Sequence, residues 1–203
     1  MSTTKRAGTA MAATLVAATA LIAVPGAAEA KAPTPAQILP KRDGLGLAPL
    51  VKTKNDCTIA KSCPSVEFAD PTYACGDGPG SPDGWFAQIA RFKNAKVAKK
   101  TVNRLFDLYL PDEVPEGQEQ QFVPISSSNV QSGAVQTAVV EERVVGCEGS
   151  EYRYVLVRKG SRVALSIAST LHIAAVSADA QVQRTRAALA KNWKRVPVST
   201  PSI

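Results

Sequence analysis

Hydrophobic and polar positions alternate, or recur at helical spacing, along the second half of the chain. Residues 85–92 are mostly apolar and predict a strand. In residues 95–109 the apolar side chains recur on one helical face, with Asn94 as the N-cap and Pro111 beyond the end. Alternation then predicts three more strands, at residues 134–145, 151–158 and 162–169.

Turn residues and a last helical segment complete this pattern. Gly160 centres a tight turn between two of the strands, which indicates an antiparallel meander. We also expect a short strand at residues 122–125 and a final helix that begins near Ser177 or Asp179 and ends near Lys194. Strands in a run, with helices segregated from them, indicate an α+β fold. The prediction is an antiparallel sheet of about four to five strands with two main helices packed on it and two disulfides.

The N-terminal segment has the three parts of a secretory signal. Two cations precede the uncharged, Ala-rich residues 8–24, and residues 28–30 form a small-x-small cleavage site. We expect a signal peptide of residues 1–30, cleaved after Ala30, and a secreted protein that is extracellular or associated with the cell wall. An uncut membrane anchor is the other interpretation, although the stretch is short and poor in Leu for a span. No second segment of this kind follows, so we expect no membrane span in the mature chain.

The remaining residues suit one domain preceded by an arm. Residues 31–56 contain four prolines and predict an extended N-terminal arm, with a short helix around residues 35–39. Residues 57–198 form the expected single α+β domain. Within it, residues 57–84 hold three cysteines and many Pro and Gly residues, so we expect an irregular stretch that depends on a crosslink.

The cysteines fit the oxidising compartment that the signal implies. An even number in an exported chain predicts two disulfides, and three pairings are open. We favour the pairs 57–63 and 75–147, because five intervening residues can close a small ring and the other two cysteines each flank a predicted strand. The alternatives are a metal site or a catalytic thiol, but both need thiolates that stay reduced, and His172 is the only histidine available. The four cysteines are Cys57, Cys63, Cys75 and Cys147.

The charge of the mature chain is moderately basic. Without the signal segment, 22 Lys and Arg face 16 Asp and Glu, a net charge of +6. Such a chain is attracted weakly to anionic polymers. Because an exported protein rarely meets nucleic acid, we expect no nucleic-acid partner. The partner that the charge favours is an anionic cell-envelope component, with another protein as the alternative.

Residues suited to catalysis or metal binding do not form a recognisable set. His172 is the only histidine and so the only possible base of a Ser–His–Asp triad, but no serine lies in a G-x-S-x-G motif. A zinc site needs three or four N or S ligands, which one histidine and paired cysteines do not supply. Glu141 and Glu142 are adjacent on a predicted strand, so they point to opposite faces. Asp77 and Asp83 resemble a calcium loop, but later positions of that loop lack the oxygen ligands it needs. We therefore expect no enzyme activity, no cofactor and no metal.

The outer face of the predicted helix at residues 95–110 is the candidate binding surface. Cations recur there at helical spacing, and Asp107 is the one acid on the helix before the proline. A solvated outer face is the plain interpretation, and contact with an anionic ligand is the functional one. The candidate binding residues are Lys93, Lys96, Lys100 and Arg104.

Several features recur together between Trp85 and the C-terminus. They are an aromatic-led strand before an Ala-rich helix, Gly146-Cys147 at a strand end, and Tyr152 and Tyr154 in a hairpin. In these features the chain resembles the extracytoplasmic sensor-type domains of actinobacterial envelope proteins, such as the extracellular domain of a mycobacterial serine/threonine kinase. The resemblance implies a secreted, two-disulfide domain that binds a ligand or acts as a sensor, without catalysis.

A second segment resembles a different class of secreted protein. The run from Cys63-Pro64 to Cys75-Gly76 is similar to part of the Kazal-type inhibitors, although those modules use six cysteines. This resemblance implies a secreted serine-protease inhibitor that uses the loop between Cys63 and Cys75. We expect the first function, a non-enzymatic sensor-type or ligand-binding domain at the bacterial cell envelope or outside the cell, and keep the inhibitor as the alternative.

Overall fold

The computed structural model describes residues 32–39, 51–53, 57–69, 84–109, 122–144 and 151–202. The predicted signal peptide therefore lies outside the described residues. The elements in chain order are η1 (Pro35–Gln37), β1 (Val51–Thr53), β2 (Ser65–Ala69), β3 (Gly84–Arg91), α1 (Ala95–Tyr109), β4 (Phe122–Ser132), β5 (Val135–Val144), β6 (Glu151–Lys159), β7 (Arg162–Ser169), α2 (Thr170–Ala175) and α3 (Ala178–Leu189).

The strands form one antiparallel sheet in an α+β fold, as predicted. Within the described ranges it has seven strands in the order β1-β2-β3-β7-β6-β5-β4, and every neighbouring pair is antiparallel. The expected number of four to five strands is therefore wrong. β1 and β2 arise in segments expected to be an arm and an irregular stretch. β4 has eleven residues where a strand of four was expected.

β2 was missed, and β4 was predicted too short, because neither strand carries a long alternating pattern of apolar and polar residues. β2 alternates Val66 and Phe68 with polar neighbours, but over five residues the signal is short. β4 is a terminal strand of the sheet, and its residues 125–132 are all exposed. Because residues 125–132 are exposed on both faces of the sheet, nothing requires apolar and polar side chains to alternate there. The sequence of this segment therefore predicts a Ser-rich loop.

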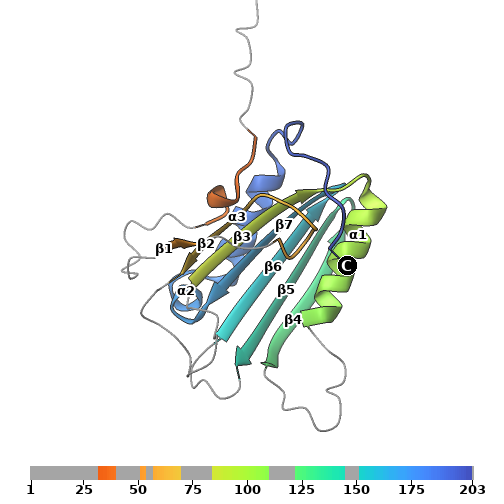
Figure 1. Cartoon of the computed structure of the whole chain (residues 1–203). Helices are drawn as coiled ribbons and strands as arrows, with labels where there is room; N and C mark the ends of the chain where they lie inside the picture. Colours follow the sequence, from red (N-terminus) through yellow and green to blue (C-terminus); the bar gives the residue numbers. More distant parts are fainter. Residues whose placement is uncertain are drawn as a thin grey trace, which may run out of the picture.

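The sheet is covered on both faces, as Figure 1 shows, with α1 on one face and α3 on the other. We call these the α1 face and the α3 face. Successive residues of β6 point to opposite faces, so Leu156 packs toward α1 while Val155 and Val157 pack toward α3, and all three are 0% exposed. A sheet covered on both faces explains why its central strands are nearly continuous hydrophobic runs.

Two glycines form the turns of the β4–β5 and β6–β7 hairpins. Gly133 joins β4 to β5 with φ 56°, and Gly160 joins β6 to β7 with φ 60°. Each stands first in a two-residue turn, where type II′ geometry requires a positive φ that a side chain disfavours. The turn predicted at Gly160 is confirmed.

Helix α3 starts as predicted and ends earlier. Ser177 is the N-cap and accepts a hydrogen bond from the Ala180 amide at 3.2 Å. The helix was expected to reach about Lys194 but ends at Leu189. Beyond it the chain turns so that Trp193, 2% exposed, packs with the core and donates from its indole nitrogen to the Ala188 carbonyl at 2.9 Å.

One predicted disulfide is confirmed. Cys57 and Cys63 are bonded, with their Cα atoms 5.6 Å apart. Cys75 and Cys147 lie outside the described residues, so their pairing stays a prediction.

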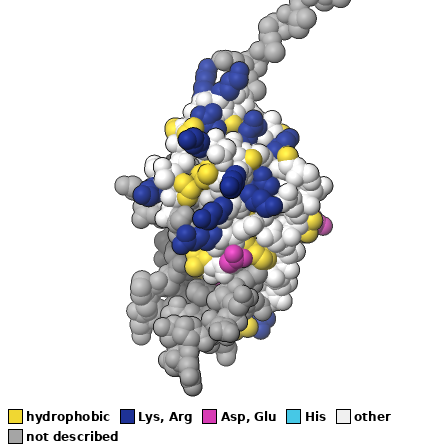
Figure 2. Space-filling view, turned by 90° about the vertical axis from the view of Figure 1, so that its right-hand side faces the viewer, with side chains coloured by type: hydrophobic (Ala, Val, Ile, Leu, Met, Phe, Trp, Pro, Cys, Tyr) yellow, Lys and Arg dark blue, Asp and Glu magenta, His cyan; other side chains and the backbone are white. Residues whose placement is uncertain are grey.

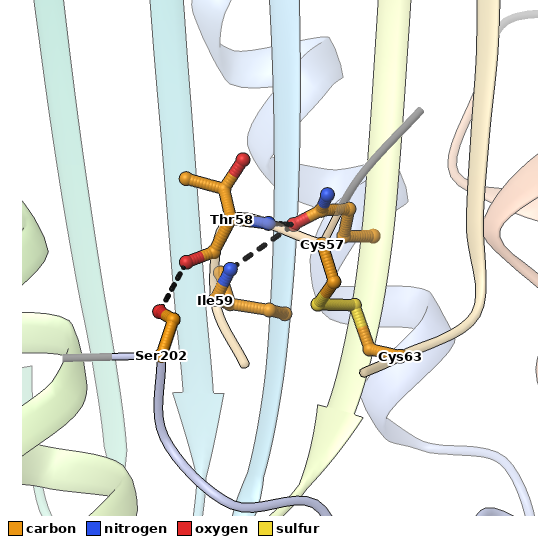
Figure 3. Close-up of a disulfide and its surroundings, with 6 residues drawn as sticks. Cys57, Thr58, Ile59, Cys63 and Ser202 are labelled. Atoms are coloured by element: carbon orange, nitrogen blue, oxygen red, sulfur yellow. Dashed lines mark hydrogen bonds between the residues drawn. A yellow bond between two sulfur atoms is a disulfide. The ribbon is translucent and has the colours of Figure 1, made fainter. Parts of the chain in front are cut away.

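The loop closed by this disulfide, residues 57–63, is hydrogen-bonded to the α1 face of the sheet. Gln88 of β3 is 0% exposed, and its side-chain oxygen accepts from the amides of Thr58 at 2.9 Å and Ile59 at 3.2 Å. Ser202 donates to the Thr58 carbonyl at 2.6 Å, which brings the C-terminal segment beside the same loop (Figure 3). The stretch expected to be irregular is thus held by a disulfide, as predicted, and also by a buried glutamine.

Candidate functional site: the basic face of helix α1

Helix α1 is firmly placed on the sheet. The side-chain oxygen of Asn94 accepts from the Val97 amide at 2.9 Å, which confirms the predicted N-cap. Ala98, Val102 and Leu105 are at most 1% exposed and pack on the α1 face. The predicted apolar stripe is therefore the buried one, although Ala95 at its start is exposed.

The opposite side of α1 presents cations to solvent. We call this surface the basic face; its residues, all exposed, are Lys93, Lys96, Lys99, Lys100 and Arg104. Asp107 is the one acidic residue of α1. Figure 2 views the molecule from this side and shows Lys and Arg side chains gathered with few acidic ones among them. Neither of the two ion pairs found in the described part of the chain involves these cations.

A polar cluster that sequence reasoning missed fixes the edge of α1 to the sheet. Gln136 of β5 donates to Asn103 of α1 at 2.6 Å and to Asn129 of β4 at 3.0 Å. Its side-chain oxygen accepts from Arg158 of β6 at 3.0 Å. In the sequence, nothing distinguishes these residues from other polar positions. Only the pairing register of the strands brings them together.

Arg158 in this cluster is a buried cation held by neutral groups. It is 3% exposed, and besides Gln136 it donates to the Gly160 carbonyl at 3.3 Å. Burial lowers the pKa of its guanidinium. No carboxylate among the described residues forms an ion pair with it. The cluster therefore adds a positive charge beneath the basic face.

The two adjacent glutamates lie on opposite faces of β5, as predicted. Glu141 lies on the α3 face and accepts from Arg153 at 2.6 Å and from Ser126 at 2.9 Å. Arg153 also donates to the Val176 carbonyl at 2.7 Å. Burial alone would raise the pKa of Glu141, but the hydrogen bonds from Arg153 and Ser126 and the charge of Arg153 outweigh it and lower that pKa.

Glu142 lies on the α1 face in a different environment. It is 4% exposed, and burial raises the pKa of its carboxyl, partly offset by a hydrogen bond from Tyr154. Because the two glutamates are on different faces, they cannot act on one substrate as a pair.

The other candidates from the sequence are not brought into this site. His172 lies in α2, and its side chain is outside what the structure describes. Asp77 and Asp83 also lie outside the described residues. Among the side chains that are described, no group of three or more His, Cys, Asp and Glu residues could hold a metal ion. No helix in the described ranges is long and apolar enough to cross a membrane.

The described residues thus form an α+β domain whose antiparallel sheet is covered on both faces and which displays one strongly basic helix. These features describe a kind of domain and do not indicate a reaction. No protein-family model matches the sequence, and no curated protein matches it significantly.

Proposed function

We propose that the chain is a secreted, non-enzymatic ligand-binding domain that acts at the bacterial cell envelope or outside the cell. Its ligand is an anionic envelope polymer, held against the basic face of α1. The single observation that carries this proposal is the exposure of all five cations of that face, with one carboxylate on the same helix.

Helix energetics support a ligand for this surface. Like charges four residues apart, as at Lys96 and Lys100, and Lys100 and Arg104, destabilise a helix by about 0.2–0.5 kcal/mol per pair. Outer faces commonly offset such repulsion with acidic side chains at the same spacing. An anionic polymer laid along the helix would remove it and gain from every cation at once.

The way in which α1 is held on the sheet also suits binding. Its buried stripe, its N-cap and the Asn103–Gln136 hydrogen bond hold the helix in one orientation. A helix already held in one orientation loses little backbone freedom when a polyanion binds. The resemblance to actinobacterial sensor-type domains agrees with a binding role but assigns no residue.

The structure is less favourable to the alternative function, a serine-protease inhibitor, because part of the proposed contact loop lies within the sheet. Residues 65–69 of the segment between Cys63 and Cys75 form β2, all of which is paired with β3. Residues 67–69 are also paired with β1 on the other edge, and backbone paired on both edges cannot extend along a protease cleft. Titration of the secreted protein against subtilisin and trypsin separates the two functions, because stoichiometric inhibition would favour the inhibitor.

The direct experiment measures retention on isolated cell walls at increasing salt. Exposed charges are screened over about 8 Å at physiological ionic strength, so retention should fall steeply as salt rises. The triple variant Lys96→Ser, Lys100→Ser, Arg104→Ser should lose retention at low salt. A matched control, Lys159→Ser, Lys191→Ser, Lys194→Ser, removes the same charge from exposed positions elsewhere and should retain most binding. Equal retention of both variants and wild type would refute the proposal.

A further inference from the structure

Among the residues that the structure describes, strand β4 is an open edge of the sheet. It pairs with β5 on one side and is the last strand in the sheet order. Its residues 125–132 are exposed throughout, and Val130 is 63% exposed. The strand carries no charged residue along its eleven positions. Such an edge offers unpaired backbone groups to any further strand.

The hairpin register shows which backbone groups face outward. Ser132 and Val135 flank the two-residue turn and form a hydrogen-bonded pair directed at one another. Because hydrogen-bonded and free positions alternate, the amides and carbonyls of Ser127, Asn129 and Gln131 point away from β5. These three residues present a row of alternating donors and acceptors about 14 Å long.

Only one end of the strand carries the features that normally protect an edge. Pro124 lacks an amide hydrogen, and the register shifts between Pro124 and Ser126 as a bulge. From Ser126 to Ser132 the pairing is regular, and this half has no proline, no bulge and no lysine. We call residues 126–132 the open half of β4.

The surroundings of the open half differ on its two faces. Asn129 points to the α1 face and shares Gln136 with Asn103 of α1. Lys99 and Lys100 lie one turn before Asn103 on the same side of the helix, so cations border the α1 face of this edge. On the α3 face the edge presents Val130.

We propose that the open half of β4 binds an extended peptide of a partner protein as an eighth strand, and that this peptide alternates acidic and apolar side chains. Its backbone pairs with Ser127, Asn129 and Gln131. Its acidic side chains lie beside the lysines of α1, and its apolar side chains cover Val130. This is strand addition to a sheet edge, where backbone hydrogen bonds supply affinity and alternate side chains supply specificity. The site goes beyond the proposed polymer binding and shares with it only the cations of α1.

A seven-residue peptide of alternating Val and Glu, capped at both ends, is the probe, with a Val and Lys peptide as its control. The variant Ser127→Pro removes an outward amide hydrogen at an edge position where proline is tolerated. Its matched control, Ser127→Val, keeps that hydrogen. We expect the acidic peptide to bind wild type and Ser127→Val equally, and Ser127→Pro at least tenfold more weakly. The basic peptide should bind none of them.

Amide hydrogen exchange gives an independent readout on the wild-type protein. The outward amides of Ser127, Asn129 and Gln131 should exchange rapidly in the free protein and become protected when the acidic peptide is present. Unchanged exchange at these three amides, or equal binding by the proline variant and its control, would overturn the proposal. Concentration-dependent dimerisation that Ser127→Pro abolishes would overturn it too, because the edge would then belong to a second copy of this chain.

The two proposals fail separately. Ser127→Pro should keep its retention on cell walls, since the basic face is intact. The triple variant of α1 should lose that retention and weaken acidic-peptide binding several-fold without removing the protection of the β4 amides at saturating peptide. Loss of strand addition with cell-wall retention kept would therefore overturn the β4 site alone.

Discussion

The adjacent glutamates of β5 should change the stability of the domain with opposite dependence on pH. Glu141 has a lowered pKa, so it contributes stability that is present above the ordinary pKa of 4.5 and is lost as pH falls through the folded-state value. Glu142 has a raised pKa, so its contribution to stability is present below the ordinary pKa of 4.5 and is lost as pH rises through the folded-state value. Each can be tested by the isosteric change of Glu to Gln.

The size of the Glu141 effect follows from its partners. Its carboxylate accepts a charge-assisted bond from Arg153, whose side chain is 9% exposed, while its own side chain is 27% exposed. A hydrogen bond to a charged group is worth about 1.5–3 kcal/mol, and a neutral one about 1 kcal/mol. Glu141→Gln keeps the acceptor but loses the charge, so the free energy of unfolding at pH 7 should fall by about 1 kcal/mol. Glu142→Gln should raise it, because no buried carboxylate then ionises and Tyr154 can still donate to the amide oxygen.

Urea unfolding of both variants and wild type from pH 3 to pH 8 is the assay. The curve for Glu141→Gln should lie below wild type at pH 7 and meet it at the acid end. The curve for Glu142→Gln should lie above wild type at pH 7 and also meet it in acid. Two differences of the same sign, or differences that do not depend on pH, would show that the assigned environments of these carboxyls are wrong.

Two further predictions concern the loop closed by Cys57–Cys63 and the proposed export of the chain. Gln88→Met removes the acceptor of the Thr58 and Ile59 amides and should lower the free energy of unfolding by about 2 kcal/mol, since buried unpaired amides cost about 1–3 kcal/mol each. The control Gln183→Met, at an exposed position of α3, should change the free energy of unfolding little. Equal losses of stability in the two variants would contradict the role assigned to Gln88. If the proposed export is right, protein recovered from the culture medium should begin at Lys31. Its intact mass should lie about 4 Da below the reduced mass, as two disulfides require, whereas a free thiol under denaturing conditions would exclude the second disulfide.

The elements that the sequence predicts are those in which one face is clearly buried. The apolar stripe of α1, its Asn94 cap and the hairpin at Gly160 each combine periodicity with a local start or stop signal, and all are confirmed. The strand β3 also lies within one residue of its predicted start.

The elements that were missed lack that combination. β4 is an exposed edge without alternation, and β2 is a short strand among Cys and Pro residues. For the candidate site, the exposed cations of α1 follow directly from helical spacing. The buried Arg158 and its partner Gln136 do not, because their contact depends on the pairing of β5 with β6, which no local pattern encodes.

The central claim is that the basic face of α1 holds an anionic polymer, and its most direct test is the salt dependence of binding to a defined polyanion. We would titrate dextran sulfate into wild type and into the triple variant of Lys96, Lys100 and Arg104, and plot the logarithm of the binding constant against the logarithm of salt concentration. Each cation that displaces a counterion from the polymer steepens this plot. The proposal predicts a steep slope for wild type, and weaker binding with a clearly shallower slope for the variant. The same slope and affinity for both proteins would show that the face is only a solvated surface.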